Sequence, residues 1–330
     1  AGFVEASADF AAVEVSSHAL EQRRVDGVRF EAALFTNLSR DHLDYHGDML
    51  SYFESKALLF LDSDTQRRIV DIDTEWGVEL AARCGADVVA VSTVADRAAV
   101  ETPHVFVRSV KAEEGGSEIT FDSSWGEGRL LVPLPGEFNV ANAALVLALL
   151  FELGVDREQA CCALSEVSAP PGRMQRVSGR GISAYVDYAH TPDAIESALL
   201  ALRGHCRGRL WCVFGCGGER DAGKRPLMGR AAEQHADEIV ITSDNSRNEP
   251  AGQIIGDIVS GLIDAQQATI IEDRAAAIAW ALGQAENGDC VLIAGKGHES
   301  FQLTGGERLP FSDFGLAQAL LTEECEEGEQ

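Results

Sequence analysis

The sequence is poor in basic residues, and above all in lysine. Its 330 residues contain 53 Asp and Glu but only 27 Lys and Arg, which gives a net charge of −26. Such a balance argues against nucleic acid and anionic lipid as partners, because both are bound through basic side chains. Salt adaptation, or a genome that encodes arginine in place of lysine, would each explain a surface that is acidic and poor in lysine. The four lysines, which are therefore conspicuous, are Lys56, Lys111, Lys224 and Lys296.

Long apolar runs and paired cysteine motifs are also absent. No run reaches 18 apolar residues, so we expect no membrane-spanning helix. The chain starts with AGFVEASADF, which has neither a Met nor the pattern of a secretion signal, so we expect a cytoplasmic fragment of a longer protein. None of the eight cysteines forms a C-x-x-C pair. We therefore expect reduced, mostly buried thiols rather than a disulfide scaffold or a zinc ribbon.

The order of strand-like and helix-like segments predicts two α/β domains. FAAVEVSS, FEAALFTN, RRIVDID and ADVVAVS are strand-like, and MLSYFESKALLFL is helix-like. Residues 104–133 contain short alternating segments that suit an antiparallel excursion. The string SAPPGR, residues 168–173, is the best linker candidate. After it, five strand-like segments separated by helical stretches predict a doubly wound parallel sheet with ligands at the carboxyl ends of its strands.

Two glycine-rich strings match nucleotide-binding motifs incompletely. GERDAGKR has the G-x4-G-K spacing of a P-loop, but Arg225 replaces the hydroxyl residue that ligates magnesium, so we reject a Walker motif. We still expect Arg220, Lys224 and Arg225 to bind anions near a strand end. GCGG at residues 215–218 lacks the third glycine of a dinucleotide fingerprint, and we disfavour that interpretation.

The string DHLDYHGDMLSYFESK combines two histidines, two aspartates and a lysine. His42 and His46, with Asp41 and Asp44, would suit zinc or a pair of hydrolytic metals, or they are a polar loop that caps backbone groups. Lys56 follows on a predicted helix with mostly apolar neighbours, which favour a neutral amine. Such an amine can capture CO2 as a carbamate, which is an oxygen ligand for a hard metal ion. A lysine whose stem merely covers the helix surface is the alternative.

Eight strings together resemble the Mur ligases, ATP-dependent amide-forming enzymes of peptidoglycan synthesis. They occur in order between residues 14 and 302 as EVSSHAL, TNLSRDHLDYHGDM, PGEFNVANA, GRMQRV, VDYAHTPDAIE, WCVFGCGGERDAGKRPLMG, DNSRNEP and IAGKGHESFQ. Within the family they are most similar to the ligases that add 2,6-diaminopimelate. Several long strings in the same order are far more specific than any single motif.

The resemblance implies a central ATPase domain over residues 1–168 and a Rossmann-like, amino-acid-binding domain over residues 169–330. The family also has a UDP-binding N-terminal domain and a P-loop, but no G-x4-G-K-[ST] string occurs in this sequence. We therefore expect a truncated central domain without its P-loop, followed by the doubly wound C-terminal domain. Such a chain should be inactive by itself.

The resemblance also implies a reaction and its reactants. The complete enzyme would join meso-2,6-diaminopimelate to UDP-N-acetylmuramoyl-L-alanyl-D-glutamate, with ATP as co-substrate, Mg2+ as cofactor and an acyl phosphate as intermediate. Because two anions must approach each other, the site needs concentrated positive charge. We expect a cytoplasmic monomer that binds only these small molecules.

Most of the family's binding roles carry over onto the first predicted domain and the region just after the linker. The implied magnesium ligands are Glu14, His42 and Lys56, the last as its carbamate (N6-carboxylysine). Asp41 and Asp44 would orient the loop that carries His42. The implied contacts to the UDP-linked substrate are Ser16, Gln22 and Arg24. The implied contacts to ATP are Asn142, Arg173, Asp187 and His190.

The remaining roles concern the incoming amino acid. Arg247 in DNSR would pair its guanidinium fork with the second carboxylate of diaminopimelate, which lysine lacks. Ser246 replaces the proline that is usual in this string, so we expect a less rigid turn. Glu299 would bind an ammonium group. The other implied contacts are Arg220, Asp244, Asn245 and Gly295.

Three alternatives stay open at this point. A lysine-adding Mur ligase is the first, although Arg247 argues against it. The second is a carbamylated-lysine metallohydrolase built on DHLDYH and Lys56, which would need further histidines at strand ends. The third is a Rossmann-like binding module that recognises diaminopimelate-like ligands without ATP.

Overall fold

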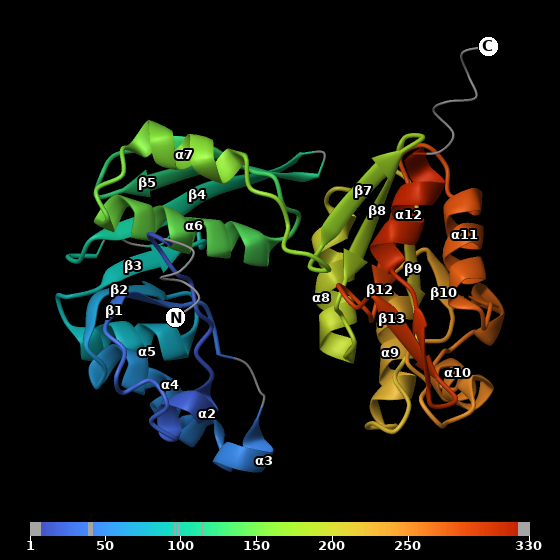
Figure 1. Ribbon diagram of the computed structural model, residues 1–330. Coiled ribbons are helices and arrows are strands. Elements are labelled where there is room, and N and C mark those ends of the chain that lie inside the picture. Colours follow the sequence, from blue (N-terminus) through green and yellow to red (C-terminus); the bar gives the residue numbers. More distant parts are fainter. Residues whose placement is uncertain (1–7, 39–41, 96, 98–99, 114, 323–330) are drawn as a thin grey trace. The chain divides into compact units, whose positions relative to one another are not determined.

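The computed structural model describes residues 8–38, 42–95, 97, 100–113 and 115–322. The chain divides into two compact units, whose ribbon is drawn in Figure 1. The first unit consists of residues 1–109, 119–130 and 141–164, and the second consists of residues 110–118, 131–140 and 165–330. No helix in the described ranges is long and apolar enough to cross a membrane.

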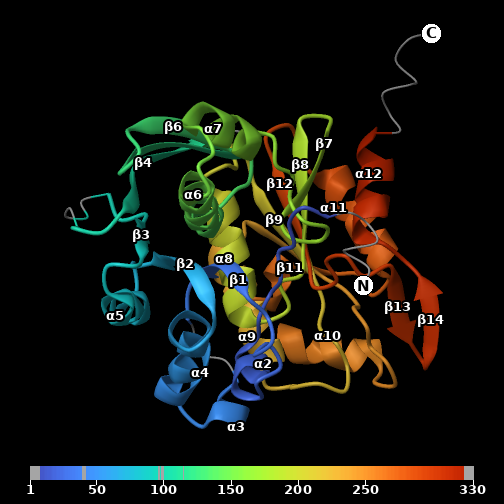
Figure 2. The ribbon, with the colours of Figure 1, turned by 60° about the vertical axis from the view of Figure 1, so that its left-hand side comes forward.

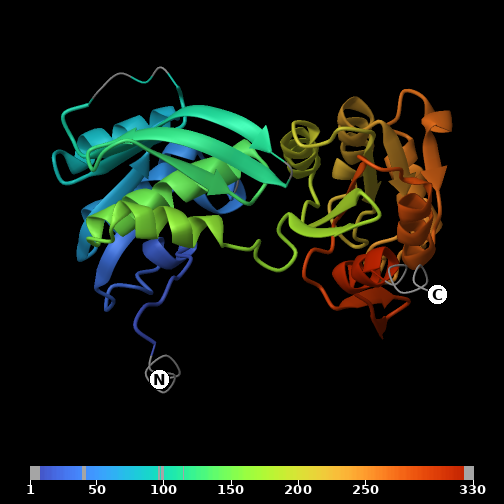
Figure 3. The same ribbon diagram turned by 90° about the horizontal axis from the view of Figure 1, so that it is seen from above.

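A six-stranded sheet runs through the first unit in the order β1-β2-β3-β4-β5-β6. β1, β2, β3 and β4 pair in parallel with one another in turn. The connections from β4 to β5 and from β5 to β6 are too short for a crossover, so this part is an antiparallel excursion. Figure 3 shows the long strands β4 and β5 side by side in teal. The strands span Phe30–Phe35, Thr65–Asp71, Val89–Ser92, His104–Glu113, Gly116–Ser123 and Gly128–Val132.

Helices α4 and α5 of this unit bury apolar side chains against β1, β2 and β3. The carboxylate of Asp48 accepts a hydrogen bond from the Ser51 N–H at 2.7 Å and so caps the start of α4. Phe53 and Phe60 of α4 join Phe35 in the core. This packing determines how the rest of α4, including Lys56, faces the sheet. The helices are α2 (Ser17–Glu21), α3 (Leu43–His46), α4 (Met49–Leu61), α5 (Glu75–Cys84), α6 (Glu137–Glu152) and α7 (Arg157–Ser165).

The predicted strand FAAVEVSS is wrong. Residues 8–16 pair with no strand of the described chain, and Ser16 caps α2 by accepting a hydrogen bond from the Ala19 N–H at 3.2 Å. The exposed fractions of Phe10 and Val13 are 80% and 64%, so the alternating apolar residues that suggested a strand are not covered.

The second unit contains another six-stranded sheet, in the order β11-β10-β9-β12-β8-β7. Neighbouring strands pair in parallel along the row β11, β10, β9, β12 and β8. Only the edge strand β7 is antiparallel to its neighbour β8. The predicted parallel sheet is confirmed, whereas the edge strand β7 was missed. The strands are β7 (Gln175–Gly179), β8 (Ile182–Asp187), β9 (Leu210–Phe214), β10 (Glu238–Ile241), β11 (Ala268–Ile270) and β12 (Cys290–Ala294).

Helices cover both faces of this second sheet, as a doubly wound fold requires. α8, α9 and α10 contribute to one apolar core, and α11 and α12 contribute to another (Figure 2). A hairpin of β13 and β14 precedes α12. The bounds are α8 (Pro192–Arg203), α9 (Lys224–His235), α10 (Ala251–Val259), α11 (Arg274–Gln284), α12 (Asp313–Thr322), β13 (Phe301–Thr304) and β14 (Glu307–Pro310).

The register of the second sheet brings four strand ends level. Ala294 of β12 pairs with Asp187 of β8 and with Phe214 of β9, and Phe214 pairs with Ile241 of β10. The loops that follow these strands carry the predicted ligand-binding residues of this unit. They therefore meet at one edge of the sheet, where parallel α/β folds bind their ligands.

The thiols are only partly buried, contrary to expectation. All cysteines in the described part of the chain are free. Cys212, Cys216 and Cys290 are buried because they lie on or directly after central strands, whereas Cys162 on the surface helix α7 is exposed.

A fully buried ion pair joins α11 to the start of α12. The Arg274 guanidinium donates to both carboxylate oxygens of Asp313, at 2.8 and 2.7 Å, and neither side chain is exposed. It also donates to the carbonyls of Ser243 and Ala294, at 3.2 and 2.9 Å, which lie just beyond β10 and at the end of β12. One side chain therefore connects two helices with two strand ends.

Replacement of this arginine should destabilise the second unit strongly. Arg274→Met leaves the Asp313 carboxylate buried without a partner, so we expect the free energy of unfolding to fall by about 3–5 kcal/mol. Urea unfolding followed by amide hydrogen exchange in β9 and β12 measures the change. Lys111→Met, which breaks an exposed ion pair with Glu113, is the control and should have no resolvable effect. Equal stability of the two variants would contradict the assigned role of the buried pair.

Candidate functional site

Three residues predicted to gather round a metal ion line one cavity in the first unit. Glu14, His42 and Lys56 border a hollow of about 540 Å³, and Ser16 lines the same cavity. Glu14 lies just before α2, His42 lies just before α3, and Lys56 lies in the middle of α4. Separate stretches of the sequence therefore converge, as the resemblance implied.

Backbone geometry presents His42 to this cavity. His42 has φ +54°, in the left-handed region that residues other than glycine adopt rarely. The ring is exposed and lies 5.0 Å from the His18 ring and 5.9 Å from the Tyr52 ring, centroid to centroid. The Lys56 ammonium is 5.3 Å from the centroid of the same Tyr52 ring. Tyr52 thus forms a common aromatic neighbour of the histidine and the lysine.

His46 does not share this role. Its side chain is 1% exposed, with Nε2 2.9 Å from Ser17 Oγ and Nδ1 3.2 Å from a Glu21 carboxylate oxygen. It stacks on Tyr52 at 5.1 Å. This histidine therefore packs against side chains, and its polar contacts in the described chain are to side chains rather than to backbone groups. Asp41 and the side chain of Asp44 lie outside the described residues.

The donor set suits magnesium once Lys56 is modified. Among the described residues no three His, Cys, Asp or Glu side chains lie close enough together to hold a metal ion. Glu14 and His42 supply two donors, and a carbamate on Lys56 would add oxygen. Magnesium ions are typically held by one or two carboxylates together with waters and substrate phosphates, so a sparse set of protein ligands fits.

The other predicted contacts of the UDP-linked substrate lie at the two ends of α2. Ser16 is the N-cap of that helix, so its hydroxyl is partly used in the structure itself. Gln22 follows α2 and donates through Nε2 to the Tyr45 hydroxyl at 3.1 Å. Arg24 donates to the Gln22 side-chain carbonyl. Gln22 and Arg24 therefore form one exposed polar pair.

The residues predicted to contact ATP are divided between the two units. Asn142 lies on α6 in the first unit, whereas Arg173, Asp187 and His190 belong to the second. The last three lie together around the carboxyl end of β8, where Arg173 is 5.0 Å from the Tyr188 ring and His190 Nδ1 is 2.8 Å from the Tyr188 carbonyl.

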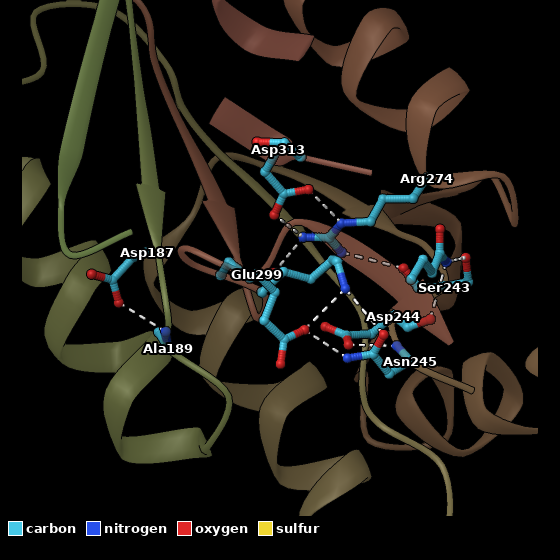
Figure 4. Close-up of polar contacts among 12 residues, drawn as sticks. Asp187, Ala189, Ser243, Asp244, Asn245, Arg274, Glu299 and Asp313 are labelled. Carbon is cyan, nitrogen blue, oxygen red and sulfur yellow. Dashed lines mark hydrogen bonds and ion pairs between the residues drawn. The ribbon is translucent and has the colours of Figure 1, made fainter. Parts of the chain in front are cut away.

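Asp187 anchors the main chain on both sides of this group. Its carboxylate accepts a hydrogen bond from the Ala189 N–H at 2.8 Å (Figure 4) and another from the Met174 N–H, also at 2.8 Å. Burial raises the pKa of Asp187, and these hydrogen bonds and the neighbouring Arg173 oppose that rise. The Lys224 ammonium donates to the His190 carbonyl at 2.8 Å and ties the next loop to the same place.

Four of the residues predicted to bind the amino acid meet beyond β10 and β12. The Asn245 amide donates to a Glu299 carboxylate oxygen at 2.7 Å (Figure 4). Asp244 is 7% exposed and approaches Gly295 so closely that a Cβ there would lie 2.4 Å from its carboxylate. Gly295 also has φ +116°, so only glycine fits this position without strain.

Arg247 lies on the same segment and keeps part of its fork available. Its Nη1 donates to the carbonyls of Gly218 and Asn245, at 2.6 and 3.4 Å. Its main chain bonds to Leu303 and Gly305 of the β13–β14 hairpin. Within the described ranges no hydrogen bond engages Nε or Nη2, so the other side of the guanidinium can pair with an acid.

The two remaining predicted contacts differ in exposure. Ser246 is 2% exposed, and its carbonyl accepts a hydrogen bond from the Glu249 N–H at 3.1 Å. Arg220 is exposed on the loop after β9.

The prediction that Arg225 binds anions is wrong. Arg225 is 2% exposed, and its guanidinium is paired with Glu249 and Asp257, each at 2.8 Å. Because two carboxylates already neutralise it, Arg225 supports the fold instead of binding an external anion as predicted.

Two buried cations next to the amino-acid residues were not predicted as part of the site. Lys296 is 0% exposed and contacts Asn245 and Glu299, and Arg274 holds the carbonyl of Ser243. A signal for Lys296 existed in the sequence, since it is one of only four lysines and follows a predicted strand. Nothing local marked Arg274, whose partner Asp313 is distant in sequence.

Two family models match the sequence. Residues 1–150 match the Mur ligase middle domain, and residues 172–297 match the Mur ligase glutamate ligase domain. The chain belongs to the Mur ligase family. This confirms the family inferred from the eight strings, and it agrees with the α/β architecture of both units.

Individual relatives narrow the similarity within the Mur ligases. UDP-N-acetylmuramoyl-L-alanyl-D-glutamate–2,6-diaminopimelate ligase of Haemophilus influenzae (strain PittEE) is 46% identical over 316 residues, which are 96% of this chain and 64% of that relative. The chain thus spans slightly less than two thirds of its length. A solved structure of a ligase with the same name is 35% identical with a TM-score of 0.74, over 98% of this chain and 66% of that one.

A more distant Mur ligase shares the fold alone. The structure of UDP-N-acetylmuramate-alanine ligase from Thermotoga maritima is 18% identical with a TM-score of 0.61, over 90% of this chain and 60% of that one.

A buried carboxyl at the carboxyl end of β2 lies outside the predicted set. Burial raises the pKa of Asp71 to about 6, although it accepts a hydrogen bond from the Asp73 N–H at 2.8 Å. Asp73 is half-buried, and this burial raises its pKa, but hydrogen bonds from Ser92, Thr93 and Arg97 hold that pKa below the usual value. The two neighbouring acids should therefore respond to pH in opposite directions.

Asp71→Asn tests this contrast in the Mur ligase chain. Between about pH 4 and 6 the folded state keeps a proton on Asp71 that the unfolded state loses, so Asp71 costs stability as the pH rises. The midpoint temperature of unfolding of the variant should therefore rise relative to that of the unmodified chain as the pH increases from 4 to 6. The difference should then stay constant above pH 6. Asp73→Asn, the matched control, should be less stable than the unmodified chain by a constant amount from pH 4 to 6, because the stabilisation given by a lowered pKa is lost only at pH values below that range. Parallel pH profiles for the two variants, measured by thermal unfolding, would refute the assignment.

Proposed function

We propose that this chain is the catalytic and amino-acid-binding part of an ATP-dependent ligase that adds 2,6-diaminopimelate to UDP-N-acetylmuramoyl-L-alanyl-D-glutamate. The observation that carries the proposal is the single cavity lined by Glu14, His42 and Lys56. The name of the relative that is 46% identical supports the choice of both substrates.

The first unit would supply the charge that lets two anions meet. Magnesium, when bound by Glu14, His42 and a carbamate on Lys56, would neutralise phosphate and carboxylate oxygens. Ser16 lies on the same cavity and is suited to hold the UDP-linked substrate, with the polar pair of Gln22 and Arg24 beside α2. These residues orient the substrate carboxylate, and they do so through side chains that other contacts already restrain.

The second unit would hold the nucleotide and the amino acid. Arg173, Asp187 and His190 of this unit are assigned to ATP binding, and Asn142 is the residue of the first unit with the same assignment. On the loops beyond β9, β10 and β12, the part of the Arg247 fork that no described residue engages would pair with the far carboxylate of diaminopimelate. Arg220 would add positive charge, and the Glu299 carboxylate would accept an ammonium group.

The length of the relatives bears on activity. No G-x4-G-K-[ST] string occurs in these 330 residues, and the chain spans 64% of the Haemophilus influenzae relative. We propose that residues 1–168 are a central domain without its P-loop and that residues 169–330 are the amino-acid-binding domain. Turnover would then need residues beyond this sequence, in a monomeric cytoplasmic enzyme.

The alternatives have less support. A metallohydrolase built on both histidines is disfavoured, because His46 is buried against Ser17 and Glu21. A lysine-adding ligase would have no use for a guanidinium directed at a second carboxylate. A binding module without ATP remains a possible outcome of the experiments below.

Calorimetry on the 330-residue chain tests the amino-acid site. We expect meso-diaminopimelate to bind and L-lysine to bind at least about tenfold more weakly, because one charge-assisted pair is missing. Arg247→Ala should weaken diaminopimelate binding by roughly 10- to 100-fold and abolish the discrimination. The control is Arg207→Ala, an exposed arginine of the same unit that lies before β9. Equal binding of both amino acids to the unmodified chain would overturn the assigned specificity.

Lys56 is tested in the extended protein, which here means the full-length gene product with any residues encoded beyond these 330. Lys56→Ala should lower ATP-dependent phosphate release with both substrates by at least about a hundredfold, since a charge-stabilising group is lost. A small carboxylate such as acetate should restore part of the rate by supplying the missing oxygens, whereas Lys111→Ala should stay fully active. Full activity of Lys56→Ala would exclude the carbamate. No phosphate release from the unmodified extended protein would leave only the binding module.

A further inference from the structure

Lys296 is a fully buried cation beside the amino-acid residues. It directly follows Gly295 at the end of β12, and none of its surface is exposed. Its ammonium donates to Asn245 Oδ1 and to Glu299 Oε2, both at 3.1 Å. It also lies 5.8 Å from the centroid of the Phe301 ring. Two of its three N–H bonds are therefore used in hydrogen bonds, and the ring is a cation–π neighbour of the charge.

Lys296 is one of two donors that fix which way the Asn245 amide faces. Asn245 Oδ1 accepts from the Lys296 ammonium and from the Leu303 N–H, the latter at 2.8 Å. Its Nδ2 donates to Glu299 Oε2 at 2.7 Å. Two donors on one side and an acceptor on the other leave one satisfactory orientation of the amide. A rotation by 180° would direct the NH2 group at two donors.

The same cation restrains Glu299. Both Lys296 and Asn245 bind its Oε2, and within the described chain no hydrogen bond engages Oε1. Figure 4 shows Glu299 and Asn245 joined in this way at the edge of the sheet. The Glu299 side chain is 23% exposed, so its second oxygen can be reached by a ligand. A partly buried carboxylate without a cation would be costly, and Lys296 supplies the compensating charge.

We propose that Lys296 is a positioning residue of the amino-acid site, which turns the amide of Asn245 and leaves Glu299 Oε1 directed at the ammonium group of the incoming amino acid. This inference rests on the proposed function. Lys296 acts through its two neighbours, because none of its own surface is accessible to a ligand.

A double-mutant cycle on the 330-residue chain tests this role by calorimetry with meso-diaminopimelate. Lys296→Met should weaken binding by at least about tenfold, because Glu299 and Asn245 lose their restraint. Glu299→Gln should weaken it by a similar or larger factor. The double variant should bind within about threefold of Glu299→Gln alone, because residues that act as one unit are not additive. A purely structural lysine would instead give losses that multiply.

Two further variants serve as a control and as an alternative to Lys296→Met. Lys111→Met makes the same substitution at an exposed lysine and should bind as the unmodified chain does. Lys296→Gln keeps a polar side chain and a donor for Asn245 without the charge, and it carries the test if Lys296→Met does not fold. It should lose affinity in the same way.

The outcomes separate the inference from the proposed function. If the unmodified chain binds diaminopimelate and the Lys296 variants bind equally well, or multiply the loss of Glu299→Gln, the positioning role is overturned and the proposed function stands. If the unmodified chain does not bind diaminopimelate, the assigned amino-acid site falls and the role of Lys296 falls with it.

Discussion

The pairing of buried cations holds the segment that follows β10. Arg274 binds the Ser243 carbonyl, Lys296 binds the Asn245 side chain, and Arg225 binds Glu249, and each is at most 2% exposed. A buried charge is tolerable only when it is paired, and each of the three pairs with at least one carboxylate. Together they connect the loops beyond β9, β10 and β12 to α9, α10, α11 and α12. The candidate amino-acid site is therefore organised before any ligand arrives.

In the first unit, the residues of the candidate metal cavity are brought together in another way. Glu14 comes from a segment outside the sheet, His42 comes from a residue in left-handed backbone conformation, and Lys56 comes from a helix fixed by its apolar face. The cavity depends on how a loop and a short helix pack on α4. The candidate amino-acid site is thus organised by buried charge, whereas the candidate metal cavity is organised by the packing of α4 and the conformation of the main chain.

Prediction from sequence succeeded where patterns were local. The five parallel strands of the second unit were found because apolar runs bounded by turn residues repeat there, and the register then brings their ends level. The convergence of Glu14, His42 and Lys56 was inferred from the family resemblance, since no spacing rule would join residues so far apart. FAAVEVSS failed because alternation alone does not guarantee a neighbouring strand. Arg225 failed because its carboxylate partners, Glu249 and Asp257, lie on elements whose proximity only the fold reveals.

The complete burial of Lys296 makes its amine less accessible to reagents than the amines of the other three lysines. Amine-directed reagents meet an exposed Lys111, half-buried Lys56 and Lys224, and a Lys296 with no surface at all. Acylation of Lys296 would therefore require the β13–β14 hairpin or the loop after β12 to separate from the sheet. In a chain with so few lysines, the rate at which Lys296 is acylated therefore reports how often that edge of the sheet opens.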